Sequence, residues 1–303
     1  MLKGTTGQIV EYKNSVHDGK YLLDDEYVEA PAQLTALRIE RLIEECKSLY
    51  QHIAIYESSF HGKVLVLDGF IQLTAADYFC YHEMIVHVPM AIIPDTPTSA
   101  LVVGGGDGAA VNELAKYRSL ERIVWVDIDA DVVEICREHF PQLHRYHDNR
   151  VEFIAMNGTD IDFKNEFDLI IVDGTDFIGE GADLASKRFY TRLAVALKPA
   201  GMVTVLGWWA WPESDYHQVT RERAQANFEQ VNYYWFIDPS MKYGHMGIFL
   251  MTNSPVDPTV PHHFDRVPTD CIQYYNKGIH SASFMLPTCF TSGMGFGSGR
   301  SEG

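Results

Sequence analysis

The sequence predicts an α/β fold in which a mostly parallel sheet carries helices on both faces and follows a small antiparallel β domain. Five short apolar runs, most of them followed by a helical pattern, support the parallel sheet; they lie at 99–103, 122–126, 151–155, 167–172 and 202–206. Strands that alternate with helices at this spacing form parallel sheets through right-handed crossovers. A glycine cluster after the first run makes the predicted sheet Rossmann-like.

The glycine cluster Gly104-Gly105-Gly106-Asp107-Gly108 joins the first predicted strand to a helix. Glycines allow the positive φ angles and the close backbone approach that such a turn requires, and the helix presents free N–H groups to a ligand. The second strand ends in Asp127, where a carboxylate can accept both ribose hydroxyls of a nucleoside. Glycine turns also serve helix–strand packing alone, but this combination favours a nucleoside site.

Asp107 indicates the charge of the ligand. A carboxylate inside the glycine turn repels a pyrophosphate and attracts a cation. The predicted ligand is therefore a positively charged nucleoside, and a sulfonium nucleoside fits this description.

The composition is that of a globular protein with a sizeable core. The chain has 303 residues, of which 46% are hydrophobic, and a formal net charge of −17. This charge argues against nucleic acid, which needs a basic face, and suits cationic small molecules. The five cysteines are widely spaced without a metal or redox pattern, and no segment resembles a signal peptide or a membrane span. We therefore expect a soluble, cytoplasmic protein with no membrane partner.

The N-terminal part is predicted to contain the antiparallel β domain. Its start, residues 1–32, is polar and loop-like, and apolar residues within 33–47 predict a short helix. Short strands are expected at 53–56 and 63–72, with a hairpin at Asp68-Gly69. The expected domains are 1–75 for the N-terminal region, 76–290 for the Rossmann-like catalytic domain, and 291–303 for a disordered tail.

A helix over 76–93 is predicted to bridge the two parts. Glu83 and His87 lie four residues apart on this helix, which raises the possibility of a metal site. No third ligand with fitting spacing follows, so a structural or substrate-contacting His82 is favoured over zinc.

Polar residues follow the predicted parallel strands, whose carboxyl ends meet at one edge of the sheet. We therefore expect the following side chains to converge: Asp107, Asp127, Asn157, Asp173 and Asp176. Two later runs, at 233–237 and 247–251, are predicted to add an antiparallel edge pair.

Several short sequence motifs lie between about residue 50 and residue 287, and their combination is more specific than any single motif. They are Val66-Leu-Asp-Gly-Phe-Ile-Gln72, Tyr81-His-Glu-Met-Ile85, Val103-Gly-Gly-Gly-Asp-Gly108, Val126-Asp-Ile-Asp129, Asp173-Gly-Thr-Asp176, Tyr274-Tyr-Asn276, Ile279-His280 and Leu286-Pro287. In this order they resemble the spermidine synthases, the aminopropyltransferases of polyamine synthesis.

This resemblance implies a small β domain on a class I methyltransferase-type Rossmann-like domain. It also implies decarboxylated S-adenosylmethionine as co-substrate, a cationic di- or polyamine as acceptor, and a homodimer or homotetramer. By position, the donor site would contain Gln51, His82, Gly104, Gly106, Asp107, Asp127, Asn157 and Gly158. The amine would contact Tyr81, Asp173, Asp176, Trp208 and Met241.

Asp173 is the expected catalytic base, with Tyr81 beside it. An alkylammonium becomes a nucleophile only after it loses a proton, so a carboxylate beside the sulfonium must hold the cation and accept that proton. The sulfonium is already an activated leaving group, so positioning and deprotonation suffice and no metal is required. The alternatives are that Asp176 only caps a helix and that Tyr81 only packs in the core.

The chain departs from the family pattern around the amine. Both prolines of the loop at 173–180 are missing, and Asn157 replaces an aspartate, although its amide can still accept from an adenine amino group. Met241, in Asp238-Pro-Ser-Met241, replaces an amine-binding tyrosine, while Trp208 and its neighbours add either a cation cage or a pocket-closing surface.

These changes predict a divergent amine pocket whose far end is less polar. We accordingly expect poor activity with putrescine, and either Glu180 replaces the lost partner or the acceptor is a longer or more substituted amine.

Two alternatives remain beside aminopropyl transfer. One is an N-methyltransferase that uses intact S-adenosylmethionine, and the other is a non-catalytic nucleoside-binding regulatory homologue. Asp107 would repel the α-carboxylate of the intact donor and so favours aminopropyl transfer. The presence of Asp173 and Tyr81 argues against the non-catalytic alternative.

Overall fold

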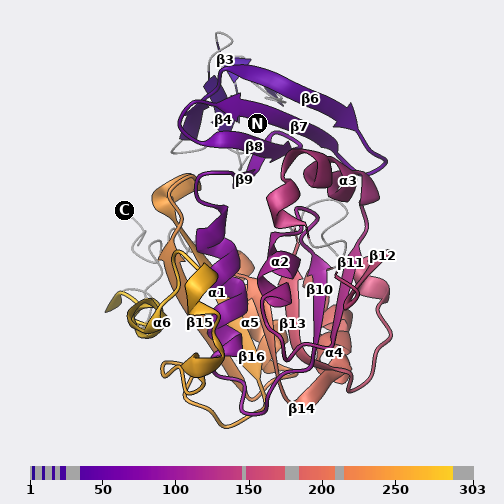
Figure 1. The fold of residues 1–303 in the computed structure, drawn as a ribbon, viewed down its shortest axis with the longest axis vertical. Coiled ribbons are helices and arrows are strands. Elements are labelled where there is room, and N and C mark those ends of the chain that lie inside the picture. Colours follow the sequence, from indigo (N-terminus) through magenta and orange to yellow (C-terminus); the bar gives the residue numbers. More distant parts are fainter. Residues whose placement is uncertain are drawn as a thin grey trace, which may run out of the picture.

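The computed structural model consists of an antiparallel sheet stacked on a larger, mostly parallel α/β domain (Figure 1). The described residues are 2–3, 9–10, 16–17, 21–24, 35–144, 148–174, 184–208 and 215–288. The predicted disordered tail at 291–303 lies outside them.

The first strands are short and antiparallel. β1 (Leu2–Lys3) pairs with β2 (Ile9–Val10), and β4 (Tyr21–Asp24) lies between β3 (Val16–His17) and β5 (Thr35–Arg38). A four-stranded sheet follows, in the order β6 (Arg41–Lys47), β7 (His52–Ser58), β8 (Gly62–Leu67) and β9 (Phe70–Thr74). The predicted hairpin between β8 and β9 is confirmed, with φ angles of 49° at Asp68 and 94° at Gly69.

The helix expected within 33–47 is wrong, because this segment forms β5 and β6. Leu37 and Ile39 are buried whereas Ala36, Arg38 and Glu40 are exposed, which is the period of two of a strand. The apolar residues of this segment also fit helical spacing. The segment is nevertheless extended, because the backbone of β6 forms antiparallel hydrogen bonds with β7.

The large sheet has seven strands in the order β12-β11-β10-β13-β14-β16-β15. The parallel strands are β10 (Ser99–Gly104), β11 (Arg122–Asp127), β12 (Val151–Ala155), β13 (Phe167–Asp173) and β14 (Leu197–Leu206). β15 (Gln230–Ile237) and β16 (His245–Thr252) form the predicted antiparallel edge pair. The chain leaves β10 toward β11 and later returns to β13, so the strand order reverses at β10 and opens a crevice there.

Helices cover both faces of this sheet, as predicted. α1 (Tyr78–Met90) and α2 (Ala109–Ala115) cover one face, and α4 (Lys187–Ala196) and α5 (Asp215–Gln225) cover the other (Figure 1). α3 (Ala130–His139) follows β11, and α6 (Lys277–Ser283) lies near the end of the described chain. The short 3₁₀ helices are Pro141–Leu143, Gly158–Asp160, Lys242–Gly244, Phe264–Arg266 and Thr269–Cys271. In the described ranges, no helix is long and apolar enough to cross a membrane.

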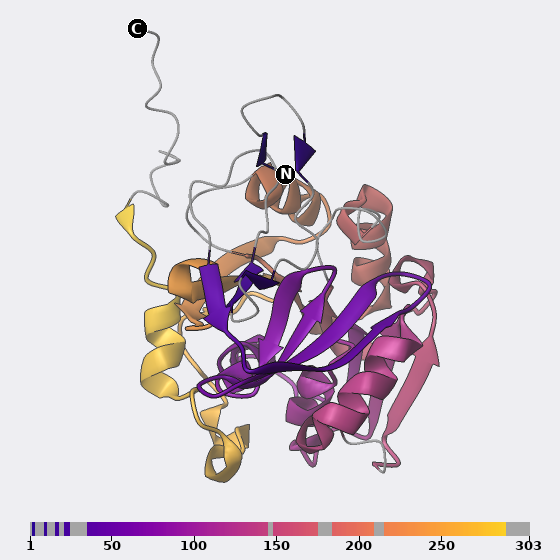
Figure 2. The same cartoon turned by 90° about the horizontal axis from the view of Figure 1, so that it is seen from above.

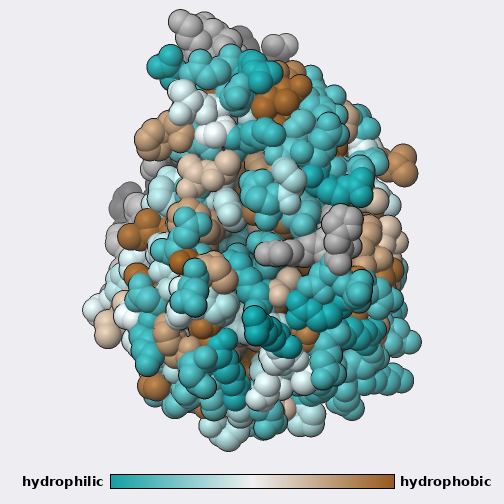
Figure 3. Space-filling view, viewed as in Figure 1, coloured by the Kyte–Doolittle hydropathy of each residue, from teal (hydrophilic) through white to brown (hydrophobic). Residues whose placement is uncertain are grey.

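A separate hydrophobic cluster joins the antiparallel sheet to helices of the α/β domain. Ile53, Ile55 and Leu65 of the antiparallel sheet pack with Val132 and Cys136 of α3. The antiparallel sheet therefore lies across the top of the α/β domain, as Figure 2 shows. Outside this contact the face in Figure 3 is mainly hydrophilic, with apolar residues scattered over it.

Gly104→Ala should destabilise the fold strongly. Gly104 has a φ of 84°, and an added Cβ would lie 2.2 Å from the backbone oxygen of Asp173. We expect a loss of about 3 kcal/mol or more in the free energy of unfolding, measured by urea denaturation.

Gly244→Ala is the matched control for this measurement. Gly244 has a similar φ of 69°, but an added Cβ would meet nothing within 4 Å. Only backbone strain remains, so the expected loss is about 1 kcal/mol. Equal losses in the two variants would contradict a steric role for Gly104.

Candidate active site

A cavity of about 370 Å³ opens at the carboxyl ends of β10, β11 and β13 and is bounded on its other side by β8 and β9. All but one of the predicted site residues line it: Gln51, Tyr81, His82, Gly104, Gly106, Asp107, Asp127, Asn157, Gly158, Asp173, Trp208 and Met241. The exception, Asp176, lies outside the described residues, as do Glu180, Trp209 and Trp211.

Glycines shape one wall of this cavity. The backbone N–H of Gly105 donates to the backbone oxygen of Asp173 at 2.7 Å, which brings the ends of β10 and β13 together. At Gly106 an added Cβ would lie 2.9 Å from Val132 and 3.2 Å from the Asp127 carboxylate, and at Gly158 it would lie 2.3 Å from Val103. A side chain at Gly106 or Gly158 would therefore clash with its neighbours, and glycine at both positions keeps this wall of the cavity open.

Asp173 is the centre of a compact polar cluster. The Tyr81 hydroxyl donates to Oδ1 of Asp173 at 2.8 Å, while Oδ2 is buried and has no hydrogen-bond partner among the described residues. The Nε2 atom of His82 lies 3.4 Å from Asp107 and 3.9 Å from Oδ2 of Asp173. Asp107 in turn accepts from the backbone N–H of Ala109 at 2.7 Å, which fixes its carboxylate at the start of α2.

The charges in this cluster shift one another. Nδ1 of His82 lies 2.7 Å from the backbone oxygen of Tyr78, so it carries a hydrogen and Nε2 faces two carboxylates. Burial opposes the charged form of His82, but Asp107 and Asp173 raise its pKa to about 9. Burial and the charge of Asp107 raise the pKa of Asp173 to about 6, although His82 and Tyr81 oppose this. The pKa of Asp107 is lowered, because His82 outweighs burial there.

Asp127 and Gln51 are held at the other end of the cavity. Oδ1 of Asp127 accepts from the backbone N–H of Asp129 at 2.8 Å, and burial raises the pKa of Asp127 to about 7. The Gln51 amide and the Ser48 hydroxyl both donate to Oδ2 of Asp129, at 2.8 Å and 2.7 Å. This contact fastens the antiparallel sheet to the strand end that carries Asp127.

The amide of Asn157 is used differently from the sequence-based expectation. Its oxygen already accepts from the N–H and the hydroxyl of Thr159, at 2.9 Å and 2.8 Å. A carbonyl oxygen has two lone pairs, so the group that remains for a ligand is the NH₂ donor rather than the acceptor. The expectation that Asn157 still accepts a hydrogen bond from adenine is therefore wrong.

The opposite end of the cavity is more acidic than the sequence indicated. Asp77 and Asp238 both line it, next to Ser240 and Met241. These two carboxyl groups argue against a less polar far end, an expectation that rested on the tyrosine replaced at Met241 and gave no weight to Asp238 in the same segment. Only the position of Asp238 directly after an apolar run could have indicated it.

Trp208 and Met241 line the same region of the cavity. The Trp208 side chain is buried, and its backbone has a φ of 53° that is unusual for a tryptophan. The Tyr233 hydroxyl donates to the Trp208 backbone oxygen at 2.8 Å and holds this conformation. Trp208 also belongs to the core cluster of α1 and α2, so this residue anchors the cavity wall.

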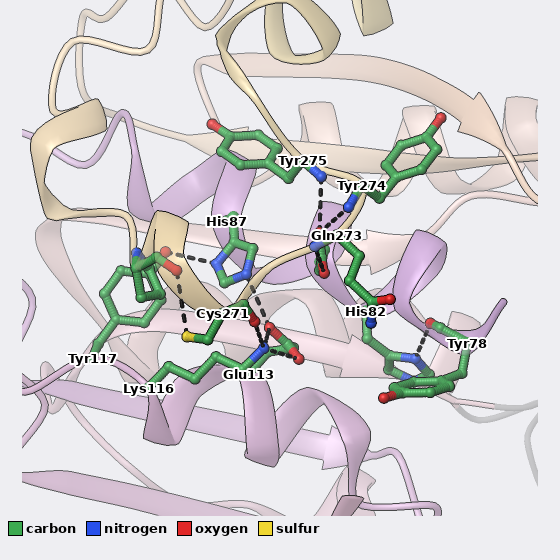
Figure 4. Close-up of polar contacts among 12 residues, drawn as sticks. Tyr78, His82, His87, Glu113, Lys116, Tyr117, Cys271, Gln273, Tyr274 and Tyr275 are labelled. Carbon is green, nitrogen blue, oxygen red and sulfur yellow. Dashed lines mark hydrogen bonds and ion pairs between the residues drawn. The ribbon is translucent and has the colours of Figure 1, made fainter. Parts of the chain in front are cut away.

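Glu83 and His87, which the sequence raised as metal ligands, have structural partners instead; Figure 4 shows those of His87. Glu83 accepts from the backbone N–H groups of Gln273, Tyr274 and Tyr275, at 2.7 Å, 2.7 Å and 2.8 Å. His87 lies 2.7 Å from the Tyr117 hydroxyl and 3.0 Å from Glu113. These contacts bind α1 to α2 and to the later loop.

The cavity favours positively charged ligands. No lysine or arginine is among the described residues that line it, and His82 is the one basic side chain in that set. The ligand atoms of His82, Asp107 and Asp173 also lie within 4.8 Å of one another, a spacing that a metal ion could use. Carboxylates in excess over cations at a partly enclosed site equally suit a sulfonium or an ammonium.

Comparison with known proteins gives consistent matches. Residues 78–260 match the spermine/spermidine synthase domain, and residues 25–75 match the spermidine synthase tetramerisation domain. The chain is 36% identical over 279 residues to a spermidine synthase of Solanum lycopersicum, covering 85% of this chain and 79% of that protein. It is 37% identical over 275 residues to spermidine synthase 1 of Hyoscyamus niger, covering 85% of each.

Solved structures are similar over nearly the whole chain. The spermidine synthase from Thermotoga maritima superposes with a TM-score of 0.82 at 27% identity, covering 94% of this chain and 98% of that one. A spermidine synthase in complex with the transition state analogue AdoDATO superposes with a TM-score of 0.81 at the same identity and coverage.

The free protein should lose stability as the pH rises from 7 to 9. Burial raises the pKa of Asp238 to about 8, and the neighbouring carboxylates hold that of His82 at about 9. A raised pKa means that the folded state binds the proton more tightly than the unfolded state, so this stabilisation disappears as pH passes the folded pKa. Urea unfolding should show a decrease of at least about 1 kcal/mol, the equivalent of one pKa unit.

Asp238→Asn removes one of these titrations and should flatten the pH dependence. A free energy of unfolding that stays constant or rises between pH 7 and 9 in the parent chain would refute these protonation states.

Proposed function

Because the chain belongs to the spermine/spermidine synthase family, we propose that it transfers the aminopropyl group of decarboxylated S-adenosylmethionine to a cationic amine and releases methylthioadenosine. The observation that carries this proposal is the Tyr81–Asp173 pair beside His82 and Asp107, in a cavity whose described lining has no lysine or arginine. Methylthioadenosine release from this donor in the presence of an amine tests it directly.

The donor is proposed to lie over the glycine turn. Asp127 has one carboxylate oxygen without a backbone contact and can accept the ribose hydroxyls. Asn157 can donate its NH₂ group to a ring nitrogen of the adenine beside Gly158. Asp107 faces the aminopropyl ammonium. Gln51 supports the ribose end of the site, because its amide binds Asp129 beside Asp127.

Asp173 is proposed to act as the base. An amine nitrogen attacks the carbon bonded to sulfur, the C–N bond forms as the C–S bond breaks, and the electron pair leaves with sulfur as a neutral thioether. The amine must first lose a proton, and Oδ2 of Asp173 is the partnerless oxygen that can accept it. Tyr81 holds the other oxygen, so the free oxygen keeps one orientation.

The acceptor is proposed to be a di- or polyamine that lies from Asp173 toward Trp208 and Met241. The expectation of poor activity with putrescine rested on a less polar far end, and the carboxylates of Asp77 and Asp238 remove that reason. Asp176 is proposed to bind the amine on the strength of its position in the motif.

Assembly is proposed to involve residues 1–75, with residues 76–290 as the catalytic domain. The match to a tetramerisation domain supports an oligomer, either a homodimer or a homotetramer. Leu49 and Phe60, in the turns before and after β7, are 94% and 82% exposed, and Leu42 of β6 is also exposed. Burial of such side chains favours association. The cytoplasm is the proposed location.

Asp173→Asn should lower turnover by about 10² or more, because an amide holds the shape of the site but accepts no proton. Binding of decarboxylated S-adenosylmethionine, measured by calorimetry, should change little. In the parent chain, kcat/KM should rise with pH as Asp173 ionises, since burial and Asp107 raise its pKa to about 6.

Asp95→Asn is a suitable control, since Asp95 is exposed and lies outside the cavity lining. It should retain full turnover. Near-native turnover in Asp173→Asn at neutral pH would exclude Asp173 as the base.

The donor preference separates aminopropyl transfer from N-methylation. We expect decarboxylated S-adenosylmethionine to bind more tightly than the intact form, whose carboxylate would face Asp107. Asp107→Asn should reduce this difference by about tenfold or more. Tighter binding of the intact donor, measured by calorimetry on the parent chain, would instead favour an N-methyltransferase.

A further inference from the structure

Asp238 is a buried carboxylate that no catalytic step uses. It follows β15 directly, is 4% exposed, and lines the cavity. Its backbone is held by a bond from its own N–H to the Gly244 oxygen and by another from the Met241 N–H to its own oxygen. In the part of the chain that the structure describes, no hydrogen bond reaches its side-chain oxygens.

Asp77 lies close to Asp238 but has a different role. Its Oδ1 accepts from the Thr74 and Ser240 hydroxyls at 2.5 Å and 3.0 Å, and its Oδ2 accepts from the Ser240 N–H at 2.8 Å. Asp77 therefore fastens the loop after β15 to the start of α1. Its charge also raises the pKa of Asp238, so a cation that binds there would relieve the repulsion between the two carboxylates.

Tyr81 links the proposed base to the strand that precedes Asp238. Asp77 occupies the N-cap position of α1, and Tyr81 lies about one turn further, about 6 Å along the helix axis, with its hydroxyl on Asp173. The Tyr81 ring also contacts Phe236, two residues before Asp238, with ring centroids 6.1 Å apart. The two ends of the amine region are therefore held by the same helix and strand.

We propose that Asp238 binds the second ammonium group of the acceptor, in place of the tyrosine that is absent at Met241. This inference rests on the proposed function, in which the first amino group reacts at Asp173. An ammonium supplies both the positive charge and the hydrogen-bond donors that a buried, unpaired carboxylate lacks. Met241 and Met246, which also line the cavity, provide apolar surface for the methylene chain between the two ends.

The environment of Asp238 disfavours its charged form. Burial and the charge of Asp77 raise its pKa to about 8, with His82 opposing this increase. Burial and the neighbouring carboxylate therefore outweigh the charge of His82, which is the basic side chain in the described cavity lining. The missing cation is supplied by the acceptor.

The test compares 1,4-diaminobutane with butylamine, which has the same carbon chain but only one amino group. With decarboxylated S-adenosylmethionine as donor, the parent chain should prefer the diamine strongly in kcat/KM. Asp238→Asn should raise KM for the diamine by about tenfold or more and change kcat/KM for butylamine by less than about twofold. Asp238→Glu, which keeps the charge, should recover part of the diamine preference.

Asp95→Asn should leave the preference unchanged, and calorimetric binding of the donor to each variant verifies that the site is intact. Equal loss for both amines in Asp238→Asn, or a parent chain that uses butylamine as well as the diamine, would overturn the role of Asp238.

Binding of the two amines to the complex with methylthioadenosine gives an answer that does not require turnover. A diamine preference that depends on Asp238 in this measurement would support the inference even if no aminopropyl transfer occurred. Absence of transfer with every amine would refute the proposed function alone. Equal binding of the two amines would refute the inference alone.

Discussion

The contact between the ends of β10 and β13 determines the geometry of the whole site. The Gly105 N–H donates to the Asp173 backbone oxygen at 2.7 Å, and Gly104 leaves that oxygen the space that a Cβ would occupy. Because the two strand ends meet in this way, the Asp173 side chain lies beside the glycine turn and within reach of Tyr81 and His82. A bulkier residue at Gly104 would separate the proposed base from the turn over which the donor is proposed to bind.

Around this junction the chain gathers acidic side chains with few basic partners. Asp107 and Asp173 share His82, whereas Asp127 and Asp238 have raised pKa values because burial disfavours their charged forms. Such a site is costly for the free protein and becomes favourable when a cation enters. A sulfonium and one or more ammonium groups would supply the missing charge, so substrate binding and stabilisation of the fold are coupled.

The departures from the family pattern at 238–241 are linked to each other. Met241 lacks the hydroxyl that the family's tyrosine provides, while Asp238 on the same short loop adds a carboxylate to the same cavity. The loop is fixed by Asp77 through Ser240, so both side chains have defined positions. The change therefore adds a carboxyl group to the cavity where the family's tyrosine hydroxyl is lost, and so does not simply remove polarity.

Local patterns in the sequence were sufficient for the parallel strands, the glycine turn and the acidic residues at the strand ends. Each depends on neighbours within a few residues, and parallel pairing then brings the strand ends to one edge. The segment 33–47 forms strands and not the helix that its sequence predicts. Its apolar residues fit both the helical and the strand period, and only pairing with β7 decides between them.

Other features depended on contacts between residues far apart in the chain. Asp77 meets Ser240 across 163 positions, and Gln51 meets Asp129 across 78. No periodicity records such contacts, because they arise only when separate elements pack. The sequence alone therefore determined which groups stand at the strand ends. The tertiary structure decided which carboxylates have partners, and it left Asp238 and one oxygen of Asp173 available for a cation.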